Sequence, residues 1–78
     1  MKLDNYGKIT FDKLWLLLEK KHLNKQWLLD NGIYKRTIYQ LVRNENVTTE
    51  TICKLCYLLK CKPQNIMEYM QPEETTTE

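Results

Sequence analysis

Helical periodicity is the feature that most restricts how this chain can fold. Two segments carry apolar residues at positions i, i+3, i+4 and i+7. They are Phe11, Leu14, Trp15 and Leu18 in the first segment and Ile52, Leu55, Cys56 and Leu59 in the second. This spacing lines one face of an α-helix, and no period-two alternation is long enough to predict a sheet. The sequence therefore predicts an all-α fold.

Capping residues mark where the first two predicted helices begin and end. The first begins with Thr10 as its cap, and Leu16 and Leu17 widen its apolar stripe, so we expect this helix to be covered on more than one side. The second follows the cap Asn24 and stops at Gly32.

Three more helices are predicted in the second half of the chain. The third spans about residues 34–43, and the fourth begins at Thr48 or Thr49 and reaches Lys60. Pro63 fits the first position of a fifth helix, where its missing N–H is not needed. The fifth helix would carry an apolar patch that either closes the core or forms a dimer seam. This patch consists of Ile66, Met67 and Met70.

Length and composition narrow the classes of function. With 78 residues the chain forms one small domain, predicted at residues 9–70 between an N-terminal arm (1–8) and an acidic, disordered tail (71–78). One His, two Gly and no paired acids on a shared element exclude the common catalytic triads, phosphate loops and carboxylate dyads. We therefore predict no enzyme activity and no small-molecule substrate.

The cysteines and the amino terminus indicate a reduced compartment. The stretch MKLDNYGKIT lacks the apolar core of a secretory signal, and no apolar run approaches the ~18 residues of a membrane span. We predict a cytoplasmic protein without a membrane role. Cys53, Cys56 and Cys61 lack a further nearby ligand for a tetrahedral zinc site, since His22 lies on another element. We interpret them as small core-filling thiols, with redox sensing as the alternative, and predict neither metal nor cofactor.

Charge is distributed unevenly along the chain. Residues 12–44 carry seven Lys or Arg against three acids, a net charge of +4, whereas residues 71–78 carry three acids and no base. This asymmetry indicates a basic body with an acidic tail, and charge alone leaves an ordinary solvated surface as the alternative.

The third predicted helix is divided into an apolar and a polar half. At about 100° per residue, one arc holds the residues expected to face the core, which are Tyr34, Ile38, Leu41 and Val42. The opposite arc holds Lys35, Arg36, Tyr39, Gln40 and Arg43. Arg and Lys donate to guanine, Gln pairs with adenine, and hydroxyls contact bases or phosphates, so this arc is typical of a helix that reads a DNA major groove. Periodicity alone equally allows the solvated face of an amphipathic helix.

The start of this helix breaks a local rule. Helix amino ends carry partial positive charge and unpaired N–H groups, and each cation there is disfavoured by roughly 0.3–1 kcal/mol. Lys35 and Arg36 nevertheless occupy the first turn. A phosphate backbone would supply the missing negative partner to the cations and to the helix end together.

The segment NKQWLLDNGIYKRTIYQLVRNEN, residues 24–46, resembles the helix-turn-helix of Cro/cI-type phage repressors and the related xenobiotic-response-element family of regulators. The flanking stretches FDKLWLLLEKK, TTETICKLCYLLKC and KPQNIMEYM are similar to the first, fourth and fifth helices of that family. The resemblance implies a compact five-helix bundle of the lambda-repressor-like type. Its third helix would enter the major groove, and its second would lie across the phosphate backbone.

The resemblance also assigns residues to roles. It implies base reading by Lys35, Arg36, Tyr39 and Gln40. We predict phosphate binding by Lys25, Gln26, Tyr34, Thr37, Arg43, Asn44 and Asn46. Relatives usually cap the third helix with Ser, Thr or Asn where this chain has Tyr34, so either the helix starts differently or DNA completes its amino end.

The function implied is that of a small transcriptional regulator, specifically a repressor, which binds double-stranded DNA as a homodimer on a roughly palindromic operator. The alternative is a protein-interaction module on the same fold, acting as an antitoxin or an adaptor. For that alternative, the acidic tail and the patch around Met67 and Met70 would matter more than the third helix.

Overall fold

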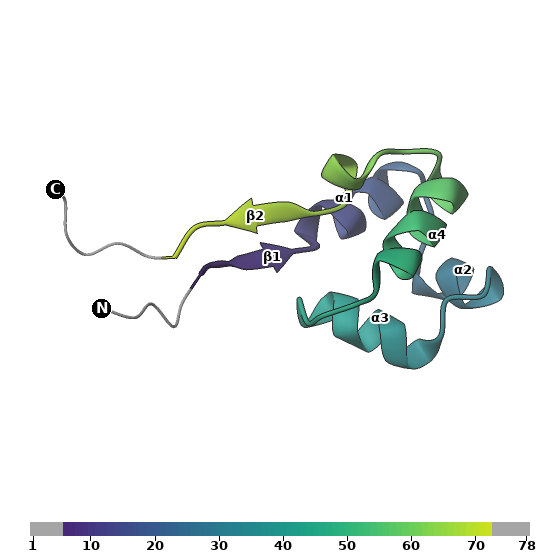
Figure 1. Cartoon of the computed structure of the whole chain (residues 1–78). Helices are drawn as coiled ribbons and strands as arrows, with labels where there is room; N and C mark the ends of the chain where they lie inside the picture. Colours follow the sequence, from purple (N-terminus) through teal and green to yellow (C-terminus); the bar gives the residue numbers. More distant parts are fainter. Residues whose placement is uncertain (1–5, 73–78) are drawn as a thin grey trace, which may run out of the picture.

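The computed structural model describes residues 6–72 and consists of four α-helices, one 3-10 turn and a two-stranded sheet in that range (Figure 1). In chain order the elements are β1 (Lys8–Thr10), α1 (Asp12–Lys20), α2 (Lys25–Asp30), α3 (Lys35–Val42), α4 (Thr49–Leu59), the 3-10 helix η1 (Pro63–Asn65) and β2 (Glu68–Met70). Most of the predicted arm and most of the predicted acidic tail lie outside the described residues.

The predicted cap of α2 and the predicted start of α4 are confirmed. The Asn24 side chain accepts the Trp27 N–H at 2.9 Å, and Thr48 Oγ1 accepts the Thr51 N–H at 3.2 Å. Each bond satisfies one of the N–H groups that an α-helix leaves open at its start. Gly32 follows α2 with φ = +96°, a left-handed conformation that L side chains rarely adopt. Sequence therefore predicts these boundaries correctly.

The prediction of a fifth helix is wrong, and the fold is not strictly all-α. The segment that begins at Pro63 makes a single 3-10 turn and then continues as β2, which pairs with β1 in antiparallel register with Ile9 opposite Tyr69. β1 lies about sixty positions upstream in the sequence, so the periodicity of the local segment carries no information about this pairing. Strands this short also show no detectable alternation of their own.

The core lies between the four helices. Among residues 6–72, the largest fully buried side chains come one from each helix, and one more follows η1. They are Leu14, Leu28, Leu41, Leu55 and Ile66. Of the apolar patch predicted for the fifth helix, Ile66 is core and Met67 packs against the core, but Met70 lies on β2 and is 44% exposed. The patch is thus split between core closure and an open surface.

One prediction for the first helix is also wrong, and another holds only in part. Thr10 does not cap α1, because it is buried at the end of β1, and the N-cap residue is Phe11, which makes no side-chain cap. Leu17 packs against the core, but Leu16 is 64% exposed, so α1 is not covered on the side where Leu16 lies. A bundle of four short helices has no further layer to place over that side of α1.

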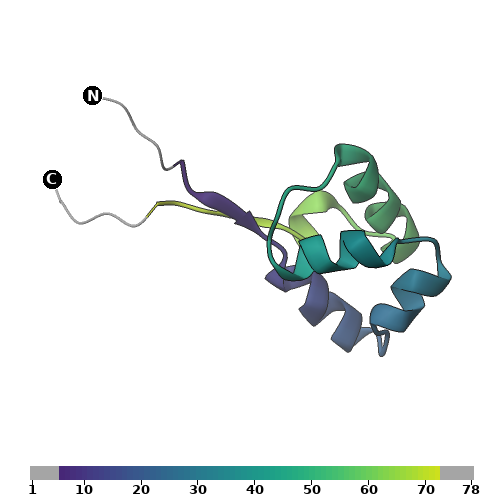
Figure 2. The ribbon, with the colours of Figure 1, turned by 90° about the horizontal axis from the view of Figure 1, so that it is seen from below.

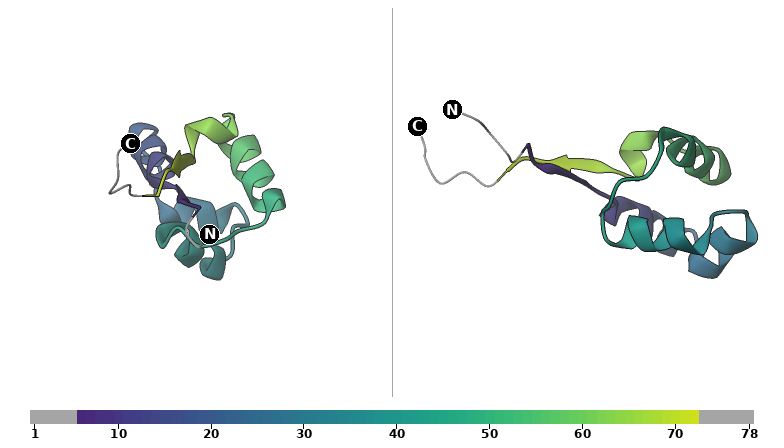
Figure 3. Two further views of the ribbon diagram at one scale, coloured as in Figure 1. Left: turned by 60° about the vertical axis from the view of Figure 1, so that its left-hand side comes forward. Right: turned by 60° about the horizontal axis from the view of Figure 1, so that its bottom comes forward.

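The β1–β2 ribbon projects away from the helical body, as seen in two further views (Figures 2 and 3). The Tyr69 hydroxyl donates to the Tyr6 carbonyl oxygen at 2.7 Å, and the Tyr69 ring lies over Gly7. A Cβ at Gly7 would approach a ring atom of Tyr69 to 2.9 Å, so glycine is required for this contact. No helix among residues 6–72 has the length and hydropathy needed to cross a bilayer.

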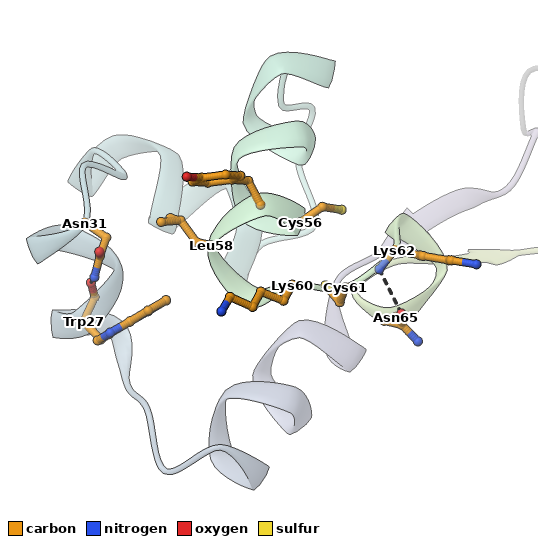
Figure 4. A pocket seen from close by; sticks show the side chains of 9 residues that line it. Trp27, Asn31, Cys56, Leu58, Lys60, Cys61, Lys62 and Asn65 are labelled. Carbon is orange, nitrogen blue, oxygen red and sulfur yellow. Dashed lines mark hydrogen bonds between the residues drawn. The ribbon is translucent and has the colours of Figure 1, made fainter.

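The three cysteines lie on α4 or just after it and differ in burial. Cys56 and Cys61 are half-buried and pack against the core, which agrees with their interpretation as core-filling thiols, whereas Cys53 is exposed and does not fill the core. Burial raises the pKa of the Cys56 thiol, and the neighbouring Cys61 and Cys53 add to the effect. Cys56 and Cys61 also border an open groove between α2 and α4, with Trp27 on the α2 side and Leu58 on the other (Figure 4).

Candidate nucleic-acid interface

The α2–turn–α3 unit packs onto the core through apolar side chains. Leu28 of α2, Ile33 of the turn and both Ile38 and Leu41 of α3 are buried in one cluster. The Ile33 N–H donates to the Leu28 carbonyl at 3.0 Å, which closes the end of α2 onto the turn. The two helices are therefore fixed relative to one another before any ligand binds, as a preformed interface requires.

Lys54 fixes the turn from α4. Its Nζ donates to the Gly32 carbonyl oxygen at 2.9 Å and lies 2.8 Å from where a Cβ of residue 32 would be. Sequence reasoning missed this residue, because its partner is a backbone atom 22 positions away. A lysine on a helix gives no local signal for such a contact.

The outer face of α3 carries the residues predicted to read bases. Lys35, Arg36 and Tyr39 are exposed, and Gln40 is half-buried beside them; Thr37, predicted to bind phosphate, is also half-buried. One helix thus presents cations at its amino end, followed by a phenol hydroxyl and an amide. These are the donor and acceptor types that a major groove accommodates.

The predicted apolar arc of α3 is wrong at its two ends. Ile38 and Leu41 face the core, but Tyr34 is 78% exposed and Val42 is 43% exposed. Tyr34 is the N-cap residue and has extended backbone angles (φ −69°, ψ 149°), so the helical wheel does not apply to it. Val42 is the last helical residue, where the core no longer lies beneath the helix. The exposed surface is therefore larger and more aromatic than the wheel predicts.

The amino end of α3 has no local compensation. Tyr34 makes no side-chain cap hydrogen bond, and the first turn contains no acid. Among residues 6–72 the only ion pair joins Arg43 to Glu45, so neither Lys35 nor Arg36 has an acidic partner in that part of the chain. The helix end and both cations therefore direct positive potential toward the same exposed side.

The two phosphate-binding candidates on α2 already make contacts of their own. Lys25 Nζ lies 5.5 Å from the centroid of the Trp15 ring, a cation–π geometry. Gln26 Nε2 donates to Asp30 Oδ1 at 2.9 Å. Both side chains are exposed at the start of α2, so they remain accessible to a ligand.

The three candidates that follow α3 differ in what they do. Asn44 has φ = +58°, and its Oδ1 accepts the Phe11 N–H at 2.8 Å, so this side chain joins the end of α3 to the start of α1. Arg43 is exposed, with its Nε 3.9 Å from a carboxylate oxygen of Glu45. Asn46 is exposed. The structural contact of Asn44 was not predicted, because it spans 33 positions.

Comparison with known proteins agrees with this geometry. The family model described as the Cro/C1-type HTH DNA-binding domain matches residues 13–72. The crystal structure of the transcriptional regulator VanUg, form II, superimposes with a TM-score of 0.80 at 30% sequence identity, over 92% of this chain and 99% of that chain. A search of curated proteins found no match. The matched residues include α2, the turn and α3, and the chain therefore belongs to the family of Cro/C1-type helix-turn-helix DNA-binding domains.

Proposed function

We propose that this protein is a sequence-specific double-stranded DNA-binding regulator that acts as a repressor in the cytoplasm, with residues 9–70 as its DNA-binding domain. In this proposal α3 enters the major groove, where Lys35, Arg36, Tyr39 and Gln40 read base edges. Phosphates are held by seven residues around it. They are Lys25, Gln26, Tyr34, Thr37, Arg43, Asn44 and Asn46.

The observation that carries the proposal is the amino end of α3. It is exposed, uncapped and cationic, and the described residues offer Lys35 and Arg36 no carboxylate. A DNA backbone beside this end would accept hydrogen bonds from its open N–H groups and neutralise both cations. Gln26 and Arg43 would then exchange their present contacts with acidic side chains for phosphate oxygens.

Asn44 has a narrower role within this proposal. Its Oδ1 is occupied by the Phe11 N–H, so only the Nδ2 group is left to donate to a phosphate. Occupancy of a promoter by a domain of this size would repress by occlusion. A homodimer would recognise an operator with two inverted half-sites, because a twofold-symmetric protein matches a twofold-symmetric sequence.

The test is selection of bound duplexes from a random double-stranded pool by the purified full chain. The proposal expects enrichment of an inverted repeat, and the spacing of its half-sites would give the separation of the two α3 helices in the dimer. A pool that stays random after repeated rounds would contradict sequence-specific binding. That result would favour the alternative of a protein-interaction module.

A further inference from the structure

The groove between α2 and α4 is a surface that the DNA-binding proposal leaves unused. Its volume is about 730 Å³, and its walls come from α2, from the carboxyl half of α4 and from the segment that leads to the end of η1 (Figure 4). Within residues 6–72, no α3 residue and no predicted DNA contact lines it. Figures 1 and 3 show the carboxyl end of α4 and η1 on one side of the helical body and α3 on another. A ligand in this groove would therefore leave the outer face of α3 free.

The apolar side chains of the groove are only partly covered. Trp27 and Leu58 pack against the core, but each is half-buried and keeps part of its surface in the groove. Tyr57, next to Leu58, is 81% exposed. Trp and Tyr anchor many protein interfaces, because each combines a large apolar contact area with a polar group that can bond to a ligand. The groove thus offers an apolar surface with an aromatic anchor.

The polar groups of the groove are rich in donors that lack an acceptor. The Trp27 Nε1–H and the Lys60 ammonium make no hydrogen bond or ion pair with any residue in the range 6–72. Asn65 accepts the Lys62 N–H through its Oδ1 at 2.9 Å, which leaves its Nδ2 group to donate. No Asp or Glu among the described residues lines the groove. Its hydrogen-bonding groups and its charge are therefore complementary to a carboxylate.

Lys60 is placed at the groove by the backbone that ends α4. Its φ of +55° is left-handed, and the Cys61 N–H after it donates to the Cys56 carbonyl oxygen at 3.0 Å. Helices that end in this way usually have Gly at the left-handed position, because an L side chain is strained there. Figure 4 shows the Lys60 side chain extended toward Trp27. A position that favours Gly thus carries a cation directed across the groove.

We propose that the α2–α4 groove docks an acidic segment of a partner protein, which places a large apolar side chain beside Trp27 and a carboxylate beside Lys60. Small-molecule sites enclose most of their ligand, whereas an open groove covers one side of it and suits an extended chain. The contact area is below that of a standard protein interface, so we expect a dissociation constant of roughly 10–100 μM. This docking is a second activity and does not require DNA.

The test is panning of a phage-displayed pool of random dodecapeptides against the full chain without DNA. The enriched peptides should combine a large apolar side chain with Asp or Glu, and a fluorescent synthetic copy of the consensus gives the dissociation constant by anisotropy. Lys60→Glu should weaken binding of this peptide by about tenfold or more, because it places like charges together. Trp27→Phe keeps an aromatic ring but removes the N–H donor, and should weaken binding by roughly threefold to tenfold.

Lys21→Glu is the matched control. Lys21 is also an exposed lysine directly after a helix, and it does not line the groove. The substitution makes the same change in net charge and has the same effect on a helix carboxyl end as Lys60→Glu. It should change the dissociation constant of the peptide by no more than about twofold. Trp27→Phe keeps the proposal testable if Lys60→Glu fails to fold.

The outcomes that would overturn the proposal are distinct. A pool without a consensus, a consensus without acids, or equal losses in Lys60→Glu and Lys21→Glu would each do so. A thermal shift with indole-3-acetate, without any enriched peptide, would assign the groove to small aromatic acids instead. Self-association of the chain that is lost in Lys60→Glu would assign it to a second copy. Because no DNA is present, none of these results depends on whether the protein reads a DNA sequence.

Discussion

The amino ends of α3 and α4 lie in one small domain but are built in opposite ways. α4 begins with Thr48, whose hydroxyl accepts the Thr51 N–H at 3.2 Å, and has Glu50 in its first turn. α3 begins with an uncapped Tyr34 followed by two cations. One end is completed by its own sequence, and the other is left open on the exposed side of the helix-turn-helix.

The difference shows that separate parts of α3 provide stability and binding. A missing cap costs about 1 kcal/mol, and each cation in the first turn about 0.3–1 kcal/mol more. The buried Ile38 and Leu41 hold α3 in place despite this cost, since burying a branched aliphatic side chain contributes about 1.5–3 kcal/mol. The packing of α3 thus holds in place an amino end whose free energy is lower beside an anion than in water.

The largest effect is expected at the open end. Arg36→Ala should weaken binding to the selected duplex by about 1–3 kcal/mol and relax preference at one base position, while thermal stability stays equal or rises slightly. Competition binding with base-substituted duplexes measures both quantities. Lys60→Ala, which removes an exposed cation beyond the end of α4, is the control and should leave base preference unchanged. Intact affinity and preference in Arg36→Ala would remove α3 from the recognition role.

Substitution at the capped amino end of α4 should have the opposite effect, lowering stability and leaving base preference unchanged. Thr48→Ala removes a hydrogen bond to the α4 backbone and should lower the free energy of unfolding by about 0.5–2 kcal/mol. Urea denaturation followed by circular dichroism gives this value. Base preference should not change, because Thr48 lies outside the proposed base-reading set. A change in preference without loss of stability would mean that the two helix starts do not divide these roles.

Completing the open end artificially should remove the difference between the two helices. Tyr34→Ser introduces a side chain that can accept an N–H of the first turn, and we expect a gain of roughly 0.5–1 kcal/mol in the free energy of unfolding. Tyr34 is largely exposed, so its removal leaves no cavity. The same denaturation experiment measures the gain, with Tyr57→Ser as the exposed-tyrosine control. Equal stability of the Tyr34→Ser variant and the unmodified chain would show that the α3 amino end is not deficient.

The smallest effect is expected at α2, whose start is intermediate between the other two. Asn24 caps it, but Lys25 stands at its first helical position. Lys25→Ala should weaken binding to the specific duplex and to an unrelated duplex equally, by less than about 1 kcal/mol. The reason is that a phosphate contact carries no sequence information. Fluorescence anisotropy with both duplexes measures this. An effect confined to the specific duplex would assign Lys25 to base reading instead.

The helices could be predicted from sequence because their determinants are local. The side chains of Asn24 and Thr48 each accept a backbone N–H only three residues further along the chain. The apolar periodicities of α1 and α4 are likewise visible in short windows of sequence. β2 could not be predicted in this way. It exists because Lys8–Thr10 lies beside it, and Pro63 favours a helical start whether or not a helix follows.

The same distinction between local and distant determinants explains which residues of the candidate site could be predicted. The exposed side chains of α3 follow from its amphipathic pattern, so Lys35, Arg36 and Tyr39 could be placed on its outer face from sequence. Tyr34 was assigned to the core because the wheel was extended by one residue beyond the helix. Lys54 and Asn44 were missed as structural residues, since each bonds a backbone group more than twenty positions away.

The salt dependence of DNA binding tests the central claim most directly. For the unmodified chain, the logarithm of the association constant should fall linearly with the logarithm of salt concentration, by about 0.9 per phosphate contact. If anions of the DNA complete the amino end of α3, the Lys35→Ala, Arg36→Ala double variant should show a slope smaller by about one to two. An unchanged slope in the double variant, or no affinity of the unmodified chain for any duplex in dilute buffer, would contradict the claim.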